Sequence, residues 1–330
     1  MSRALDEDVA ASLKSGNPLA AYKSISETLQ LSPSAGLLEL EILGKTHPLP
    51  GGLFAVQDGP AVGVSKSGLV QAFLVARKQL AGHLDKSSPR TDDELFAATA
   101  VILLMDPEHL TAANTRKRLL QNINPGLDNT QPLLTREKHL VDSLLTSRLH
   151  RHTKSPTLWN HRRWLLRLFE SRGLPVDVLG DITNVVLVAG ERHPRNYYAW
   201  CHARFLAGLS PEVSSGEILG VVKEWCWKHH TDISGWTFLY YLLSVCGSLG
   251  EAASCSTFAE VIELVSSLRL ANESIWVFLR TLAASELVGE KERVKFRSAG
   301  QDLLETLTTS TDLRVLGSAL DWCETCRISD

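Results

Sequence analysis

Hydrophobic residues recur at intervals of three and four along most of the chain, which is the spacing of amphipathic helices. The pattern predicts short helices at Leu5–Lys14 and Leu19–Leu31, a longer one from Ser67 to His83, and further helices from Asp92 onward. Between Ser32 and Gly68, four prolines and seven glycines interrupt the pattern, and these residues are incompatible with long helices.

The interrupted stretch contains a candidate β-hairpin. The sequence LFAVQDGPAVGV has two runs typical of β-strands on either side of Asp58-Gly59, a favoured hairpin turn. Pro60 weakens the prediction because it has no amide hydrogen for a strand ladder. We therefore divide the chain into a mixed, irregular region at 1–90, which can hold a short β-hairpin, and a helical region at 91–330.

A repeat organises the helical region. Five segments align, and four of them carry a tryptophan at the equivalent position, while Ala113 takes that position in the first. The repeat tryptophans are Trp159, Trp200, Trp236 and Trp276, and the successive spacings are 46, 41, 36 and 40 residues. Such a period is typical of a helix–loop–helix pair.

Each tryptophan lies shortly after a residue suited to start a helix. Ser155 can cap a helix and Pro156 fits its first turn, and Asn196, Asp232 and Asn272 occupy matching positions. The partner helices are expected at Arg136–His150, Val176–Arg192, Gly216–His229 and Thr257–Leu270. Because one hairpin cannot bury its own apolar face, neighbours must stack, which predicts an all-α fold: a right-handed α-α superhelix of helix-hairpin repeats. The four tryptophans are expected to serve this packing.

Composition narrows the class of protein. The chain has 330 residues, 44% of them hydrophobic, with 34 Lys+Arg against 37 Asp+Glu, so disorder is excluded and binding to nucleic acid through bulk charge is not expected. The longest apolar run, Phe96–Met105, is about half of the roughly 20 residues that a membrane span needs. The first residues lack a secretory signal and the six cysteines are irregularly spaced, which predicts a soluble cytoplasmic protein with free thiols.

The repeat resembles a known family. In KSPTLWNHRRWLL, the residues Trp159, Asn160, Arg162 and Arg163 stand where the α-subunit repeat of protein prenyltransferases has them. HPRNYYAWCHARF and NESIWVFLR resemble later repeats, and LLMDPEHLTAANTRKRLL is most similar to the branch of prenyltransferase α-subunit repeat-containing proteins. The resemblance extends over about Asp92–Ser285.

The chain also departs from the family pattern. The arginine expected three residues after tryptophan is replaced in the last three repeats by Ala203, Leu239 and Leu279. We expect these losses to affect packing and interface arginines, and so the partner surface more than the fold.

The resemblance implies a function. In this family the α subunit wraps around a separate β subunit, which holds zinc and the isoprenoid pocket, so no cofactor and no metal are expected in this chain itself. A family lysine near the isoprenoid diphosphate corresponds to Arg195, the one candidate catalytic residue, which would stabilise charge on the leaving diphosphate; a solvated loop arginine is the alternative. The branch implies geranylgeranyl transfer to a cysteine of a substrate protein, with a β subunit of the Rab geranylgeranyltransferase type.

A basic segment and several aromatic residues supply candidate contacts. Arg148–Arg172 holds seven Lys+Arg and the single acid Glu170, which fits either a solvated face or a surface for an acidic partner. The candidate substrate- or partner-binding residues are Asn196, Tyr197, Tyr198, Arg162, Arg163, Trp164, His161, His202 and Arg204.

The other motifs are weaker indications of function. Cys323 and Cys326 form a Cys-x-x-Cys pair without the strand-then-helix setting of a redox motif, and Cys226, His229 and His230 form one small cluster, which is insufficient for zinc. A non-catalytic helical-repeat adaptor remains the alternative function, because a fold does not fix a function.

Overall fold

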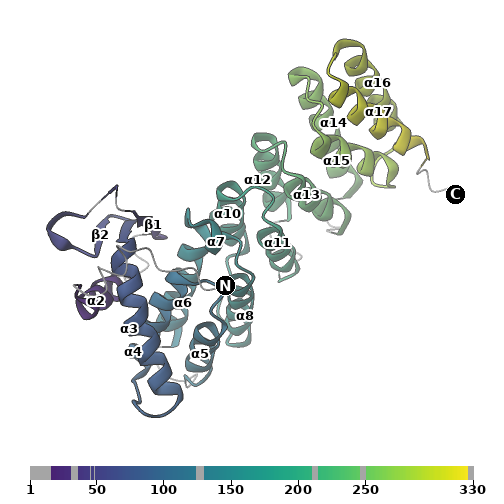
Figure 1. Cartoon of the computed structure of the whole chain (residues 1–330). Coiled ribbons are helices and arrows are strands. Elements are labelled where there is room, and N and C mark those ends of the chain that lie inside the picture. Colours follow the sequence, from purple (N-terminus) through teal and green to yellow (C-terminus); the bar gives the residue numbers. More distant parts are fainter. Residues whose placement is uncertain are drawn as a thin grey trace. The chain divides into compact units, whose positions relative to one another are not determined.

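The computed structural model confirms an all-α chain built from helix hairpins, with a small sheet in the N-terminal region (Figure 1). It describes residues 16–30, 36–44, 46–47, 49–123, 130–209, 215–245 and 250–325. The predicted helix at Leu5–Lys14 and Cys326 of the Cys-x-x-Cys pair lie outside these residues. The chain divides into two compact units, Met1–Val176 and Asp177–Asp330.

The first unit contains the sheet and the first two repeats. Its elements are α2 (Pro18–Leu29), β1 (Glu39–Leu43), η2 (Pro50–Gly52), β2 (Ala55–Asp58), β3 (Ala61–Ser65), α3 (Lys66–Leu84), α4 (Asp92–Met105), α5 (Leu110–Gln121), α6 (Thr130–Thr146), α7 (His150–Thr153) and α8 (Pro156–Ser171).

The predicted hairpin is present as β2 and β3, which pair antiparallel. Gly59 and Pro60 form the connecting turn, with Gly59 in the left-handed region at φ 57°. Pro60 therefore lies in the turn and not in the ladder, which is why its missing amide does no harm. Strand β1 was not predicted; it pairs parallel to β3 and makes the sheet order β1-β3-β2.

The N-terminal elements pack onto the repeats. Helices α2, α3 and α4 lie together, and β1 lies against α6. The chain entering β1 is attached to α6 by two hydrogen bonds: the Leu38 amide donates to Ser143 Oγ at 2.9 Å, and Nε2 of His139 bonds to the Gly36 carbonyl at 2.7 Å. The region 1–90 is thus joined to the helical region through packed faces.

The second unit holds the last three repeats. Its elements are α9 (Val178–Asp181), a π-helical segment η3 (Ile182–Val186), α10 (Leu187–Arg192), α11 (Tyr197–Leu209), α12 (Ser215–Lys228), α13 (Ile233–Val245), α14 (Gly250–Leu268), α15 (Glu273–Ala284), α16 (Glu290–Thr306) and α17 (Ser310–Thr325).

The repeat tryptophans lie in the core. Trp159 is 4% exposed, and Trp200, Trp236 and Trp276 are at most 1% exposed. In the second unit each ring contacts an aromatic ring further along the chain: Trp200 lies 5.6 Å from Phe238, Trp236 5.1 Å from Phe278, and Trp276 5.5 Å from Phe296.

Three of the indole nitrogens make the same hydrogen bond. Trp159, Trp236 and Trp276 each donate to the backbone carbonyl six residues earlier, at 2.9–3.0 Å. The tryptophan therefore fixes the loop before its own helix as well as the stacking of neighbouring repeats.

The predicted caps are also present. Side-chain oxygens of Ser155, Asn196, Asp232 and Asn272, each four residues before a tryptophan, accept backbone amides of the helix that follows. In the first repeat, which has Ala113, the Nδ1 atom of His109 takes this role by accepting from the Ala112 amide at 3.2 Å. A histidine is not a common capping residue, so the sequence did not suggest it.

Candidate functional site

Arg195 occupies a fixed loop between α10 and α11. Its φ of 60° lies in the left-handed region, which is uncommon for a residue with a side chain. Its amide donates to Oδ2 of Asp232 at 2.6 Å. Asp232 is 4% exposed and accepts from Ser234 and Gly235 through Oδ1 at the start of α13. One buried carboxylate thus starts α13 and holds the backbone of Arg195.

The side chains beside this backbone face solvent. Arg195 is exposed, Tyr197 is 69% exposed and Tyr198 is 39% exposed. The two tyrosine rings meet edge to face with centroids 5.6 Å apart. We call Arg195, Tyr197 and Tyr198 the Arg195 surface. It offers a guanidinium that can pair with phosphate or carboxylate beside two aromatic anchors.

The other candidate residues on α11 are buried or half-buried. Asn196 is 2% exposed, and its Oδ1 accepts the Ala199 amide. His202 is 1% exposed, with its ring 5.4 Å from that of Phe205. Half-buried Arg204 lies 5.5 Å from the ring of Tyr241. The expectation that the side chains of Asn196 and His202 contact a partner is therefore corrected, because both are enclosed by this chain.

The same correction applies to Arg162 and His161 on α8, which are both 0% exposed. Nε of Arg162 donates to Oδ1 of Asp142 on α6 at 2.6 Å. Nε2 of His161 lies 2.7 Å from Oε1 of Glu137, also on α6. The repeat arginine is therefore an internal ion-pair partner and not an interface residue.

The first repeat contains an equivalent pair. Arg116, three residues after Ala113, is 4% exposed and its Nε donates to Oε1 of Glu137 at 2.9 Å. Its Nη1 also donates to the Phe96 carbonyl and to Thr99 Oγ1. Sequence reasoning missed Glu137 and Asp142 because each stands about twenty residues from its arginine, on another helix: Glu137 follows Arg116 and Asp142 precedes Arg162.

The electrostatics of this cluster follow from burial. Burial alone raises the pKa of Glu137, but the Arg116 charge and the His161 hydrogen bond outweigh it and lower the pKa to about 2. Burial lowers the pKa of His161, against the opposing effect of Glu137. We therefore take His161 as a neutral ring that donates from Nε2 to an ionised Glu137.

Arg163 and Trp164 remain partly exposed on α8. The Trp164 ring packs against a core cluster of Leu120, Leu134, Leu165 and Phe169. Nζ of Lys117 lies over the same ring, 5.6 Å from its centroid. These two residues keep their place as candidates for a partner surface.

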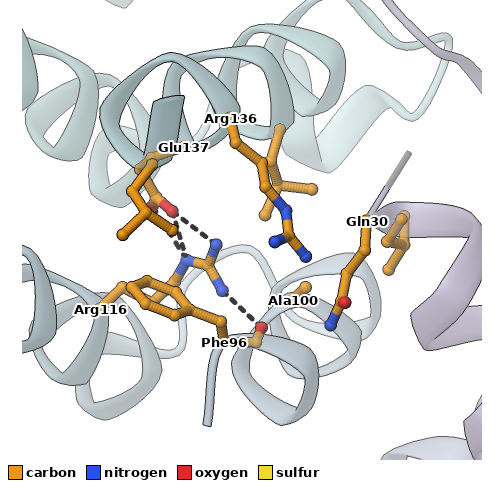
Figure 2. Close-up of a pocket in the computed structure, with 9 residues that line it drawn as sticks. Gln30, Phe96, Ala100, Arg116, Arg136 and Glu137 are labelled. Atoms are coloured by element: carbon orange, nitrogen blue, oxygen red, sulfur yellow. Dashed lines mark hydrogen bonds and ion pairs between the residues drawn. The ribbon is translucent and has the colours of Figure 1, made fainter. Parts of the chain in front are cut away.

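Figure 2 shows a pocket in the first unit where α2, α4, α5 and α6 meet. The Arg116–Glu137 ion pair lies along one side, and the side chains of Arg136 and Gln30 lie on the other. Its volume of about 20 Å³ corresponds to a single water site. The pocket is therefore far too small for an isoprenoid chain.

Cys226, His229 and His230 are each engaged in packing or hydrogen bonds and not in a metal site. Cys226 is fully buried and its thiol pKa is raised by burial. His229 stacks on Trp225 with ring centroids 4.2 Å apart, and Nδ1 of His230 bonds to Asn272. In the described part of the chain, no three His, Cys, Asp or Glu side chains gather as a possible metal site, and no helix is both long and apolar enough to cross a membrane.

Two family models match parts of this chain. Residues 142–169, the end of α6 through α8, match the protein prenyltransferase alpha subunit repeat, and residues 158–268 match the ECM9 middle domain. The chain carries the prenyltransferase α-subunit repeat. The family resemblance, including the branch of repeat-containing proteins, is thereby confirmed.

Three relatives give the extent of the similarity. Protein prenyltransferase alpha subunit repeat-containing protein 1 of Homo sapiens is 33% identical, over 46% of this chain and 40% of its own length. The related protein 1-B of Xenopus laevis is 28% identical, over 56% of this chain and 46% of its own. Protein ECM9 of Saccharomyces cerevisiae is 30% identical, over 46% of this chain and 41% of its own. The chain thus spans less than half the length of these relatives.

Proposed function

We propose that this chain acts as the α subunit of a heterodimeric protein prenyltransferase. The Arg195 surface carries the proposal: an exposed arginine on a fixed backbone, beside two exposed tyrosines, at the start of a repeat helix. The match to the prenyltransferase α-subunit repeat supports it. The partner would be a β subunit of the Rab geranylgeranyltransferase type.

In this proposal the β subunit contributes the zinc and the isoprenoid pocket. The sulfur of a C-terminal cysteine of the substrate protein, bound by the β subunit as a thiolate, forms a bond to the isoprenoid carbon while the bond from that carbon to the diphosphate oxygen breaks. Negative charge then builds on the leaving diphosphate. The Arg195 guanidinium, held by the Asp232 hydrogen bond to its amide, would stabilise that charge. The isoprenoid would be geranylgeranyl and the reaction cytoplasmic.

The test is co-expression of the chain with a Rab-type β subunit, followed by size-exclusion chromatography with and without geranylgeranyl diphosphate. A one-to-one complex that labels a cysteine-bearing protein supports the proposal. Failure to associate, with the chain folded, contradicts it.

Arg195→Ala then tests the residue within the complex. Loss of one charge-stabilising group should slow transfer by about 100- to 1,000-fold with the heterodimer intact. Arg195→Lys should retain more activity than Arg195→Ala because it keeps the charge. Arg314→Ala, an exposed arginine on α17, is the matched control and should leave the rate unchanged.

A non-catalytic adaptor is the second candidate function. The observation that favours it is a group of surface cations on α5 and α8 that the transferase proposal does not use. Under this alternative, Arg195→Ala has no effect on any transfer activity, and the partner binds to the surface cations of α5 and α8.

A further inference from the structure

The small sheet of the first unit has two edges that differ in their surroundings. The strand order β1-β3-β2 places β1 at one edge and β2 at the other. Strand β1 lies against α6, and Ser143 and His139 of that helix bind the chain that enters it. Strand β2 contacts α2, but no other strand among the described residues pairs with its outer side. An edge strand with unpaired backbone groups can pair with another chain.

The register of the hairpin identifies the backbone groups that point away from the sheet. The Ser65 amide donates to the Phe54 carbonyl at 2.9 Å, so these two residues form a hydrogen-bonded pair. Such pairs occur at every second position of an antiparallel ladder. Ala55 and Gln57 fall at the positions between them and therefore direct their amides and carbonyls outward. Within the described part of the chain, these groups have no hydrogen-bond partner.

A groove beside β2 has room for the side chains of an added strand. Its volume is about 410 Å³, which is within the range of ligand-binding clefts. Gln57 lies opposite Val62, which is 1% exposed, and opposite residues of a ladder share one face of the sheet. The groove is therefore on the same side of the sheet as the core, and every second side chain of a strand added beside β2 would point toward α2. The residues that line the groove are Ala20, Lys23, Ser24, Glu27, Thr28 and Gln57.

The lining of the groove favours an uncharged occupant. Ala20, Ser24 and Thr28 have small side chains and stand four residues apart, so they share one face of α2. The two charged residues of the groove, Lys23 and Glu27, lie 4.0 Å from each other and leave no net charge. Threonine and valine have a high propensity for extended strands, and both are small enough to pack beside these side chains.

We propose that β2 and α2 bind an extended, uncharged segment of a partner protein, which adds to the sheet as a further strand beside β2. Backbone hydrogen bonds to Ala55 and Gln57 would provide affinity, and the fit of alternate side chains against α2 would provide specificity. Leu53, directly before β2 and 52% exposed, supplies an apolar contact at the end of the strand. This inference uses neither the Arg195 surface nor an isoprenoid, so it is independent of the prenyltransferase proposal.

Other occupants fit this edge less well. Nucleic acids and anionic membranes are bound through an excess of positive charge, and the groove lacks one because Glu27 stands beside Lys23. A second copy of the chain would have to pair β2 with β2. This strand has only four residues, and short edge strands disfavour pairing between identical edges.

The experiment uses a fluorescently labelled peptide of alternating threonine and valine, with a lysine at each end, and measures its binding to the full chain by anisotropy. We expect saturable binding, and no binding of a version with N-methylated central amides, because that version cannot donate to the strand. Amide hydrogen exchange measured by NMR should slow at Ala55 and Gln57 when the peptide binds. The amides of Val56 and Asp58, which face β3, should change little.

Variants of the edge separate backbone from side-chain effects. Gln57→Pro removes an outward amide but no hydrogen bond to β3, a position where proline is tolerated. It should weaken peptide binding at least about fivefold, the effect of one net hydrogen bond. The matched control, Gln57→Ala, keeps the amide and should change the affinity less than about twofold. Ser24→Trp fills the groove from α2 and should weaken binding to a similar extent; it keeps the test decisive if circular dichroism shows that the proline variant does not fold.

Three results would contradict the proposal. The first is an absence of peptide binding by the wild-type chain, or binding that leaves the exchange of the Ala55 and Gln57 amides unchanged. The second is equal affinity of the folded Gln57→Pro and Gln57→Ala variants. The third is self-association of the chain that Gln57→Pro abolishes, which would assign the edge to a second copy of this chain.

Discussion

At the scale of single residues, the buried arginines explain the variation of the repeat. Arg116 and Arg162 lie three residues after the tryptophan position and pair with Glu137 and Asp142 of α6, the helix that follows α5 and precedes α8. A buried ion pair is expensive to desolvate and can be replaced by apolar residues at little cost. Ala203, Leu239 and Leu279 occupy the same position in later repeats and are fully buried. The departures from the family pattern therefore alter internal packing and not the partner surface.

Arg162→Leu should lower the free energy of unfolding by about 3 kcal/mol, because it leaves the Asp142 carboxylate buried with Lys138 as its remaining cation. Arg162→Leu/Asp142→Leu should recover most of the loss. Urea unfolding measures both, with Arg314→Ala on α17 as the exposed control. If the double variant is as unstable as the single one, the apolar-replacement explanation is wrong.

Glu137 predicts a pH dependence of stability. Its pKa in the folded chain is lowered from 4.5 to about 2, so the native state resists protonation. The stabilisation is complete above pH 4.5 and is lost as the pH falls toward 2, a change of roughly 3 kcal/mol. Urea unfolding between pH 2 and 6 should show this slope, and Glu137→Gln should flatten it. An unchanged slope in the variant would assign the acid sensitivity to other carboxylates.

At the scale of the elements, each repeat helix starts with the same arrangement. A capping side chain stands four residues before the tryptophan position, and the cap or its neighbour often bonds to the loop of the previous repeat. Ser155 Oγ donates to the Pro107 carbonyl, Asp232 accepts from the Arg195 amide, and Ser274 Oγ donates to the Thr231 carbonyl. The start of each of these helices thus has two roles: it caps its own helix, and it attaches that helix to the loop of the preceding repeat.

Asn272→Ala should cost about 1 kcal/mol of stability, the usual effect of removing a helix cap. Asp232→Ala should cost more, about 2 kcal/mol, because it also leaves the part-buried Arg195 amide without its acceptor. Asn160→Ala, an exposed position inside α8, is the control and should be neutral or slightly stabilising. Thermal unfolding by circular dichroism measures all three, and equal effects of Asn272→Ala and Asp232→Ala would argue against the second role of Asp232.

At the scale of the whole molecule, the chain holds two compact units, each with a core of its own. In repeat proteins, stability is the sum of repeat and nearest-neighbour contributions, so a local loss stays largely local. A single two-state transition is therefore not expected for this chain.

Trp276→Ala tests this directly. The ring is 0% exposed and contacts Phe296, so its removal should cost about 3–5 kcal/mol locally. Hydrogen-exchange mass spectrometry should show faster exchange in α15–α17 and unchanged exchange in α3 and α4. Trp322→Ala, which removes a half-exposed ring, should have a small effect. Uniform acceleration over both units would show global coupling.

The sequence was sufficient for most of the features that depend on local spacing, although it did not indicate the His109 cap. The period of the tryptophans predicted the helix hairpins, the caps at Ser155, Asn196, Asp232 and Asn272 were correctly placed, and the hairpin around Gly59 was found. These features are readable because each depends on residues within a few positions of one another. Strand β1 was missed because its pairing with β3 joins residues about twenty positions apart.

The tertiary structure alone decided which candidate side chains are available. In the sequence, Arg162, His161 and His202 stand close to residues that are at least partly exposed, such as Arg163. Only the packing against α6 and the neighbouring helices shows that Arg162, His161 and His202 are buried. The hydrogen bond from the Arg195 amide to Asp232, across 37 positions, likewise depends on a contact between distant segments. Local spacing determines helices and their starts, whereas burial and ion pairing are set by contacts between distant segments that no local pattern encodes.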